Sequence, residues 1–497
     1  MQQDNKVKRV VIAGGGTAGW MAAASLAKLL GKALDVTLIE SDQIPTVGVG
    51  EATIPTLHIF HRLLGINEQE FMAATNATFK LGISFENWKD GQDKYIHSFG
   101  FLGKDCWASS FTSFWVKGQQ QGVASQIGDY CTEHLAARRG RFAVLPSRDL
   151  NHAYHLDAGL YAKFLQKIAF DHGCKRVEGK IEDVLLDDDS GHITAIKLDN
   201  GQTVEGDLFL DCTGFRGLLI DKALHTGFED WGHWLPCDRA IAVQTSCTDK
   251  QVPYTRSIAR EAGWQWRIPL QNRTGNGLVY CSHYMSEEQA KAKLLANIDG
   301  EPLNEPRVIR YQTGTRKQHW NKNCIAIGLA SGFIEPLEST GIHLFQRGII
   351  RLMQMFPLNG INQNDVDEFN AQTKFECDNI RDFIILHYHL TERTDTPFWR
   401  YCKNMDIPDT LKHRMNHFKA AARMFKKDGE LFGETSWVQV MIGQGLMPEQ
   451  YHPIVDTMSD EELAHFLSTI KANVSKQVDN FPDHYDFIQR YCKSANM

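Results

Sequence analysis

The sequence lacks several features that mark large classes of proteins. Its 53 Lys and Arg residues stand against 60 Asp and Glu, a formal net charge of -7, so a nucleic acid is not an expected partner. No apolar stretch is long enough to span a membrane, and no internal repeat is present. Because the first residues do not form a signal peptide either, the sequence predicts a cytoplasmic protein.

Closely spaced cysteines are also missing. The 11 cysteines form no CxxC pair, and an odd, scattered set predicts reduced thiols rather than disulfides. Three histidine pairs could suggest metal ligands: His58 and His61, His152 and His155, and His387 and His389. No cysteine or carboxylate at a matching spacing accompanies them, so no metal site is expected.

A nucleotide-binding fingerprint opens the chain. The apolar run 8–13 predicts a buried strand that ends at the glycine-rich turn 14–19, followed by a helix over 20–30 and a second strand over 35–40. The free N–H groups at the start of that helix would hold a pyrophosphate, and Glu40 would accept from ribose hydroxyls. A second fingerprint is absent, so a built-in NAD(P)H domain is not expected.

The middle of the chain predicts a helix and a small sheet. The pattern favours a helix over 156–170 and strands over 184–186, 194–198 and 208–210, separated by hairpin turns. These strands would form an antiparallel meander that closes on 211–214. Such a meander is the usual insert of FAD proteins with the glutathione-reductase-like fold, which favours FAD over NAD.

The last third of the chain is mostly helical. The segment 325–328 predicts a strand that returns to the main sheet, and amphipathic runs predict helices over 345–356, 366–388, 409–427 and 459–473. The expected fold is therefore α/β, a doubly wound FAD-binding module with an antiparallel meander plus a mostly helical substrate module. The FAD module would comprise residues 1–95, 150–225 and 310–350, and the substrate module residues 96–149, 226–309 and 351–497.

Further motifs follow the glycine-rich turn in a fixed order. They are Gly48–Pro55, Phe79–Lys80, Gly263–Pro269 and Pro336–Ile342. In this order they resemble the motifs of the flavin-dependent halogenases, often called tryptophan halogenases, from Val10 to about Trp399. The resemblance implies an enzyme that uses FADH2 and O2 to oxidise chloride or bromide to hypohalous acid, which then halogenates an electron-rich aromatic ring.

The resemblance also assigns catalytic roles. Lys80 would hold hypohalous acid by a hydrogen bond or become a haloamine, which requires a desolvated lysine. Glu338 would stabilise positive charge on the ring or take its proton, and the N–H groups of Thr340 and Gly341 would hold halide. A solvated surface lysine and an ordinary acid at a helix start are the alternatives for the first two residues.

A Trp-x-Trp pattern lies in the third of these motifs. Trp264, Trp266 and Ile268 alternate, so they would share one face of a strand, and that face could simply pack on the core. In the family that the chain resembles, the two tryptophans are thought to keep the organic substrate away from the flavin. Halide, and not an aromatic ring, would then receive the oxygen.

The remaining cofactor assignments rest on the same resemblance. The segment 48–55 would be a glycine-hinged loop that covers the flavin, and where related hydroxylases have Gly-Asp this chain has Gly328–Ala330. The expected cofactor-binding residues are Gly14, Gly16, Thr17, Ala18, Gly19, Glu40, Val49, Ile181, Asp211, Gly214, Leu329 and Ile342.

The substrate is expected to be neutral. In enzymes that act on free tryptophan, a glutamate precedes a late Phe-Trp pair and holds the amino group, but Thr394 occupies that position here. An indole-like compound or a phenol is therefore expected, unless Glu392 or Asp395 replaces the missing acid. The expected substrate contacts are His97, Phe99, Tyr388, Phe398 and Trp399.

Three alternatives remain open at this point. The first is a flavin monooxygenase that hydroxylates its aromatic substrate directly, the second a halogenase of free tryptophan, and the third a flavin-binding protein without catalysis. For the halogenase, the expected partners are a separate NAD(P)H-dependent flavin reductase and a small aromatic substrate, and a homodimer is expected by analogy with the family.

Overall fold

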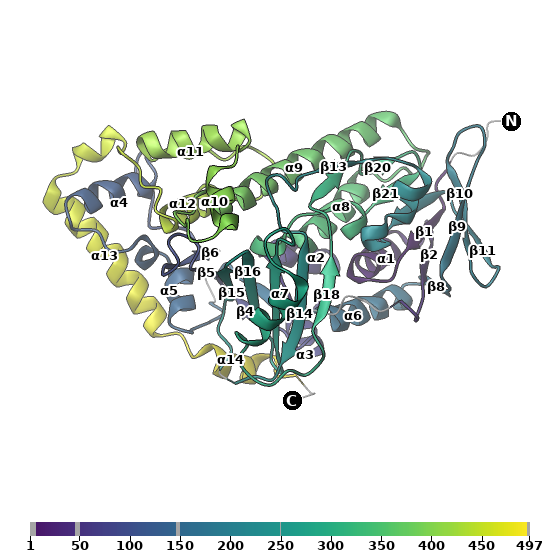
Figure 1. Ribbon diagram of the computed structural model, residues 1–497, viewed down its shortest axis with the longest axis horizontal. Helices are drawn as coiled ribbons and strands as arrows, with labels where there is room; N and C mark the ends of the chain where they lie inside the picture. The colour runs from purple at the N-terminus through teal and green to yellow at the C-terminus, as the bar shows by residue number, and fades with distance from the viewer. Residues whose placement is uncertain (1–5, 45–49, 146–149, 249, 495–497) are drawn as a thin grey trace. The chain divides into compact units, whose positions relative to one another are not determined.

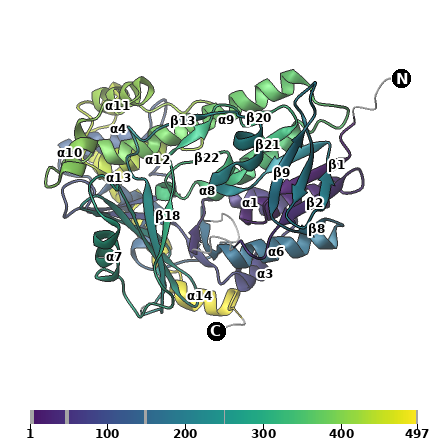
Figure 2. The same ribbon diagram turned by 45° about the vertical axis from the view of Figure 1, so that its right-hand side comes forward.

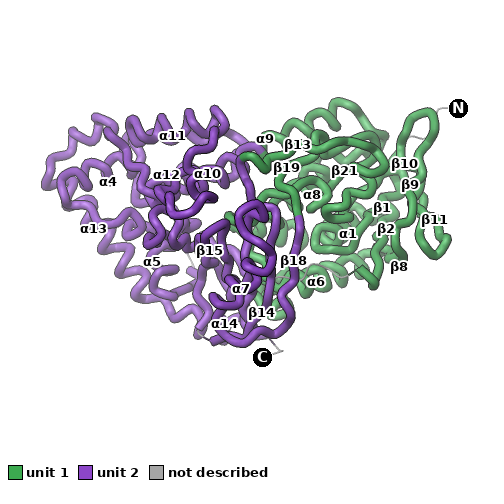
Figure 3. The backbone as a smooth tube through the Cα atoms, viewed as in Figure 1, with its two compact units in different colours: residues 1–77, 156–233, 311–377 green, residues 78–155, 234–310, 378–497 purple. Residues whose placement is uncertain are grey.

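The computed structural model describes residues 6–44, 50–145, 150–248 and 250–494 (Figure 1). The chain divides into two compact units, each assembled from three segments (Figure 3). Unit 1 comprises residues 1–77, 156–233 and 311–377, and unit 2 comprises residues 78–155, 234–310 and 378–497. Lys80, which was expected in the FAD module, therefore lies in unit 2. The assignment of cofactor and substrate to separate modules stays a prediction.

Unit 1 contains a six-stranded sheet with the order β20-β21-β12-β1-β2-β8. Its strands are β1 (Arg9–Ala13), β2 (Asp35–Glu40), β8 (Lys175–Glu178), β12 (Leu208–Asp211), β20 (Trp320–Asn321) and β21 (Cys324–Ala326). β1 pairs in parallel with both β2 and β12, and β21 joins in parallel beyond β12. The predicted fingerprint strands and the late returning strand are thus confirmed.

The helices of unit 1 begin with α1 (Thr17–Leu30), which contacts α6 (Ala158–Asp171) and α8 (Gly341–Gln354). Figure 2 shows α1 and α6 beside the strands β1, β2 and β8. The other helices and the small strands of this unit are α2 (Leu57–Leu63), α3 (Glu68–Ala74), β3 (Gly50–Ala52), β13 (Phe228–Asp230), β19 (Gly314–Arg316) and β22 (Gly332–Phe333).

The antiparallel meander exists, but its third strand differs from the prediction. It consists of β9 (Ile181–Leu186), β10 (Ile193–Leu198) and β11 (Thr203–Glu205). The predicted strand 208–210 instead belongs to the main sheet as β12. All four residues of β12 are buried, as expected of a parallel strand covered on both faces, whereas a meander strand would alternate.

Unit 2 is built on a seven-stranded sheet with the order β18-β14-β17-β16-β15-β5-β6. Its strands are β5 (Gly82–Glu86), β6 (Lys94–Ser98), β14 (Arg239–Thr245), β15 (Thr255–Arg260), β16 (Gly263–Pro269), β17 (Thr274–Tyr280) and β18 (Arg307–Arg310). Neighbouring strands are antiparallel except β15 and β5, which run parallel. A separate pair joins β4 (Thr78–Lys80) to β7 (Ala153–Asp157).

The C-terminal part of the chain is helical, as predicted. The helix α9 (Gln363–His389) begins in unit 1 and ends in unit 2. The remaining helices of unit 2 are α4 (Phe111–Gln120), α5 (Thr132–Arg138), α7 (Glu287–Leu295), α10 (Pro397–Asn404), α11 (Asp409–Ala421), α12 (Glu434–Gly443), α13 (Asp460–Asp479) and α14 (His484–Tyr491). Among the described residues, no helix is both long and apolar enough to cross a membrane.

Candidate functional site

The three glycines of the fingerprint play different structural parts. Gly14 has φ +110°, and a Cβ atom there would lie 2.3 Å from the carbonyl oxygen of Cys212. A Cβ atom at Gly19 would lie 1.9 Å from the carbonyl oxygen of Gly14. At Gly16, by contrast, no described atom lies within 4 Å of that position. Gly14 and Gly19 therefore permit a tight turn and close packing, and Gly16 leaves an open approach to the backbone.

The start of α1 suits an anionic ligand. Gly16 is its N-cap residue, no side chain caps the helix, and its first turn contains no acidic residue. The first N–H groups of a helix have no partner within the helix and attract anions. The N–H groups of the first turn, which includes Thr17 and Ala18, are suited to the pyrophosphate of a dinucleotide.

Glu40 already has partners at the end of β2. Its carboxylate accepts hydrogen bonds from Arg176 Nε (2.6 Å) and Trp20 Nε1 (3.3 Å). A carboxylate offers about four acceptor positions, so two bonds leave capacity for a ribose hydroxyl. The ion pair with Arg176 was not expected from the sequence.

Asp211 has a structural task. It is fully buried, and its carboxylate accepts four hydrogen bonds, two from Thr213 and two from the N–H groups of Leu219 and Ile220. Its oxygens therefore shape the loop that follows β12, and the predicted part of Asp211 in binding the cofactor stays a prediction. The next glycine, Gly214, has φ +69° and open space at its Cβ position.

The other predicted cofactor residues are only partly described. Ile181 and Leu329 are half-buried and Ile342 is buried, whereas Val49 lies outside the described residues. In the same predicted loop, burial raises the pKa of Glu51 to about 7. The sequence motif alone does not reveal this rise in the pKa of the Glu51 carboxyl.

The start of α8 forms a small concave backbone surface. Ser339 has left-handed backbone angles (φ 61°, ψ 35°), and Thr340 follows with right-handed angles (φ -88°, ψ -5°). Such an alternation directs successive N–H groups toward one point and favours an anion. No described atom lies within 4 Å of a Cβ atom placed at Gly341. The carboxyl group of Glu338, two residues earlier, is fully buried.

Lys80 is fully buried at the end of β4, so the alternative of a solvated surface cation is wrong. Its Nζ lies 5.2 Å from the centre of the Phe99 ring, a distance at which an ammonium group is attracted to an aromatic face. Phe99 is anchored by a hydrogen bond from its N–H to the carbonyl of Leu81. Lys80 is thus a desolvated amine beside an aromatic ring, as the predicted role requires.

A buried histidine supports the strand of Lys80. His155 contacts the hydroxyls of Thr78 (2.9 Å, Nδ1) and Thr255 (2.9 Å, Nε2), and Thr78 donates to the carbonyl of Pro269 (2.7 Å). Burial and the charge of Lys80 hold the pKa of His155 well below its usual value. The histidine is therefore neutral and joins β4 and β15 to the end of β16. Sequence inspection treated it only as a doubtful metal ligand.

Trp264 and Trp266 lie on one face of β16, as predicted. Their exposed fractions are 2% and 8%, and their ring centres lie 6.1 Å apart. Trp266 is paired with Gly277 of β17, where a Cβ atom would lie 2.0 Å from its ring. Gly277 therefore provides the space that the indole ring of Trp266 occupies. Whether this face separates substrate from flavin stays a prediction.

Comparison with known proteins decides the family. The family model described as tryptophan halogenase matches residues 9–460. A tryptophan 6-halogenase, ThaL from Streptomyces albogriseolus, is 34% identical and is matched over 98% of this chain and 99% of its own. The solved flavin-dependent halogenases Xcc4156 from Xanthomonas campestris (55% identity, TM-score 0.97) and BrvH from Brevundimonas sp. BAL3 (45%, 0.94) each match 98% of this chain and 99% of theirs.

The chain belongs to the tryptophan halogenase family. It is therefore an enzyme of the flavin-dependent halogenase class, with the mixed α/β fold predicted from its sequence. Neither a hydroxylase nor a flavin-binding protein without catalysis is favoured by these matches.

Four of the five predicted substrate contacts of this halogenase are buried in unit 2, and Phe99 is half-buried. Tyr388, Phe398 and Trp399 have no exposed surface, and Trp399 donates its Nε1 hydrogen to the carbonyl of Arg260 (2.7 Å). His97 is also buried, with its ring edge-on to Phe383. These side chains are packed against other aromatic rings, and whether they contact a substrate stays a prediction.

The segment that holds the amino group in tryptophan enzymes offers no buried acid here. Thr394 is exposed, and so are Glu392 and Asp395. Asp395 forms two hydrogen bonds with the guanidinium of Arg393 (2.7 and 3.0 Å), and Glu392 lies 3.9 Å from Lys89. Both candidate replacement acids thus already have cationic neighbours.

Proposed function

We propose that this chain is a two-component halogenase that receives FADH2 from a separate NAD(P)H-dependent flavin reductase and halogenates a neutral, electron-rich aromatic such as indole. The observation that supports this proposal best is the fully buried amine of Lys80 beside the ring of Phe99. A lysine that only solubilised the protein would not be desolvated in this way.

FAD fits the residues present in unit 1. The open Gly16 backbone and the uncapped start of α1 would hold the pyrophosphate, and Glu40 would hold the ribose. When bound in reduced form, the cofactor would supply two of the four electrons that reduce O2 and halide the other two, so that one oxygen atom passes to halide and the other to water. A homodimer also stays a prediction.

The protein's own residues would then act on halide and substrate. The N–H groups of Thr340 and Gly341 hold chloride or bromide, and Lys80 holds the resulting hypohalous acid or exchanges an amine hydrogen for the halogen with loss of water. The aromatic ring takes the halogen, becomes positively charged and then loses a proton. Glu338 either accepts that proton or stabilises the positive charge on the ring before the proton leaves.

The neutral substrate follows from the electrostatics of the 392–395 segment. Free tryptophan carries an ammonium group, whose charge-assisted hydrogen bond to a carboxylate contributes on the order of 1.5–3 kcal/mol. Thr394 cannot supply that bond, and Asp395 is paired with Arg393. Indole has no ammonium group, so its binding does not depend on a carboxylate at this position.

The test is a competition between indole and free tryptophan. The purified protein would receive FAD, NADH, a flavin reductase, O2 and either chloride or bromide, and products would be read by their isotope pattern in mass spectrometry. Catalase controls for peroxide chemistry. The variant Lys80→Ala should lose the halogenated product, whereas the control Lys117→Ala, which removes another buried lysine of unit 2, should keep it.

Each outcome bears on a separate part of the proposal. Halogenated indole in excess over halogenated tryptophan supports both the reaction and the substrate class. A preference for tryptophan contradicts the interpretation of Thr394, and an oxygenated product without halogen contradicts the proposed reaction.

A further inference from the structure

We propose that His343 is a positioning residue for halide binding, because its buried imidazole holds the first turn of α8 between α2 and α9. This inference rests on the proposed function, in which the N–H groups of Thr340 and Gly341 bind halide. His343 is two residues beyond Gly341 and would act only through these backbone groups, without contact to halide itself.

The imidazole of His343 has a partner on each side. Its Nδ1 lies 2.9 Å from Thr56 Oγ1, and its Nε2 lies 3.1 Å from Glu376 Oε1. Thr56 precedes the first residue of α2, and Glu376 lies on α9. Only 4% of the His343 surface is exposed. One ring therefore connects the starts of two helices to a third helix.

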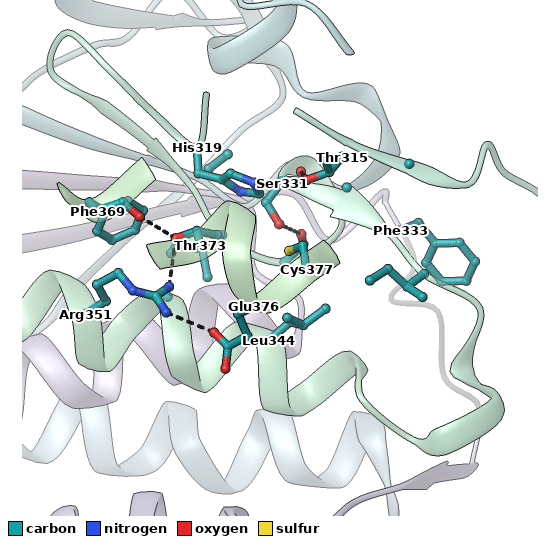
Figure 4. Close-up of a pocket in the computed structure, with 17 residues that line it drawn as sticks. Thr315, His319, Ser331, Phe333, Leu344, Arg351, Phe369, Thr373, Glu376 and Cys377 are labelled. Carbon is teal, nitrogen blue, oxygen red and sulfur yellow. Dashed lines mark hydrogen bonds and ion pairs between the residues drawn. The ribbon is translucent and has the colours of Figure 1, made fainter. Parts of the chain in front are cut away.

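The carboxylate of Glu376 anchors this connection. It also accepts hydrogen bonds from Arg347 (3.1 Å) and Arg351 (2.9 Å), and Figure 4 shows Arg351 between Thr373 and Glu376. Burial opposes its ionisation, but the hydrogen bond from His343 and the neighbouring positive charges prevail and lower the pKa of Glu376 to about 2. An ionised carboxylate only accepts, so Nε2 of His343 must donate to it.

The start of α8 lacks the usual means of stabilisation. No side chain caps this helix, and its first turn contains no acidic residue. The hydroxyl of Thr340, at the N-cap position, is buried without a hydrogen-bond partner among the described residues. Since no cap defines the direction of the first N–H groups, the contacts of His343 within the same turn hold these groups in place.

The same contact reaches the segment predicted to cover the flavin. Thr56 directly follows the motif Gly48–Pro55. A change in the position of that segment would therefore shift His343 and, through α8, the halide-binding N–H groups. His343 thereby connects two parts of unit 1 that the sequence motifs present as separate.

The test separates halide affinity from catalysis. His343→Phe removes both polar contacts, and Thr56→Val removes only the contact to Nδ1. The control His319→Gln changes another buried histidine of unit 1, which bonds to Thr315 (3.0 Å) and not to Thr56 or Glu376. Halogenation of indole would be measured against bromide concentration with FADH2 saturating. Bromide binding to the protein without FAD would be measured by ⁸¹Br NMR line broadening.

We expect His343→Phe to raise the bromide KM and the bromide Kd about tenfold, equivalent to about 1.4 kcal/mol, with kcat at saturating bromide within twofold of wild type. Thr56→Val should raise both about threefold, and His319→Gln should change neither. Should His343→Phe fail to fold, the Thr56→Val result decides.

Two results would overturn the proposal. An unchanged bromide KM and Kd, with only a lower melting temperature, would show that His343 is merely structural. A lower kcat with an unchanged bromide KM would place its effect on another step. Failure of the proposed function looks different, because the wild-type protein itself would then show no bromide-dependent product.

Discussion

The two units each bury a histidine that joins three structural elements, but they surround it differently. In unit 1, His343 belongs to a charged network with Glu376, Arg347 and Arg351. In unit 2, His155 contacts only the hydroxyls of Thr78 and Thr255 among the partners described above. The difference matches the ligands proposed for each unit. A neutral histidine adds no second positive charge next to Lys80, whereas a network of charges can order a helix start that must receive an anion.

The largest expected effect is on catalysis in unit 2. Lys80→Met keeps the length and apolar stem of the side chain but removes the amine. We expect the rate of halogenated product formation to fall by about 10²–10⁴-fold, the range typical of a positioned catalytic group, with the melting temperature unchanged or raised, since a buried charge is removed. The rate is measured by liquid chromatography and the melting temperature by calorimetry. A fall of less than about threefold would refute a catalytic role for Lys80.

The next largest effect is on stability in unit 1. Glu376→Gln leaves the side chain of Arg351, of which 3% is exposed, without its ionic partner. Breaking a buried ion pair in this way costs about 3–5 kcal/mol, which urea unfolding would detect. The comparison calls for Glu229→Gln as control, because its ion pair with Lys374 is largely exposed and should contribute less than about 1 kcal/mol. Equal effects of the two changes would contradict a special status for the buried network.

The pH dependence of stability should separate the two histidine networks. The pKa of His155 is lowered from 6.5, so its contribution is present above pH 6.5 and is lost as pH falls, by up to about 1.4 kcal/mol per pH unit. The pKa of Glu376 is lowered from 4.5 to about 2, so its contribution is present above pH 4.5 and is lost between pH 4.5 and 2.

His155→Gln should therefore flatten the stability curve between pH 6.5 and 4.5, and Glu376→Gln only the part below pH 4.5, as followed by urea titration at each pH. A change in the same pH range for both variants would remove the distinction between a neutral and a charged network.

The smallest expected effect concerns a hydroxyl of unit 2. Thr255→Val removes the partner of His155 Nε2 at nearly constant volume. Leaving a buried neutral acceptor without a donor costs about 1–3 kcal/mol, and this cost should not change with salt, because no ion pair is lost. Urea unfolding at low and high NaCl concentrations tests this. A marked salt dependence would indicate that unit 2 also relies on charge at this histidine.

Local patterns accounted for much of the fold. The strand, glycine turn, helix and second strand at the N-terminus were located because their periodicity and turn residues lie within one continuous stretch. The alternation of Trp264 and Trp266 predicted a shared strand face for the same reason. The membership of β12 was misassigned, although the uninterrupted apolar run Leu208–Leu210 was a signal for a parallel strand.

The site was predicted less completely. The resemblance named Lys80 and Glu338, but the burial of the lysine and its position beside Phe99 depend on how β4 packs. The support by His155 and His343 gave no signal in the sequence. Their hydroxyl partners lie 77, 100 and 287 residues away along the chain. A single histidine in a sequence does not predict a contact with so distant a residue.

The order of the motifs, the family and the nucleotide-binding turn could be inferred from the amino-acid sequence, because each depends on residue types at short spacing. Which side chains are removed from water, and which buried groups contact one another, became visible only in the folded chain. Desolvation and hydrogen bonding between distant residues depend on packing. The same packing places Lys80 beside an aromatic ring and gives a charged network to one buried histidine and a neutral one to the other.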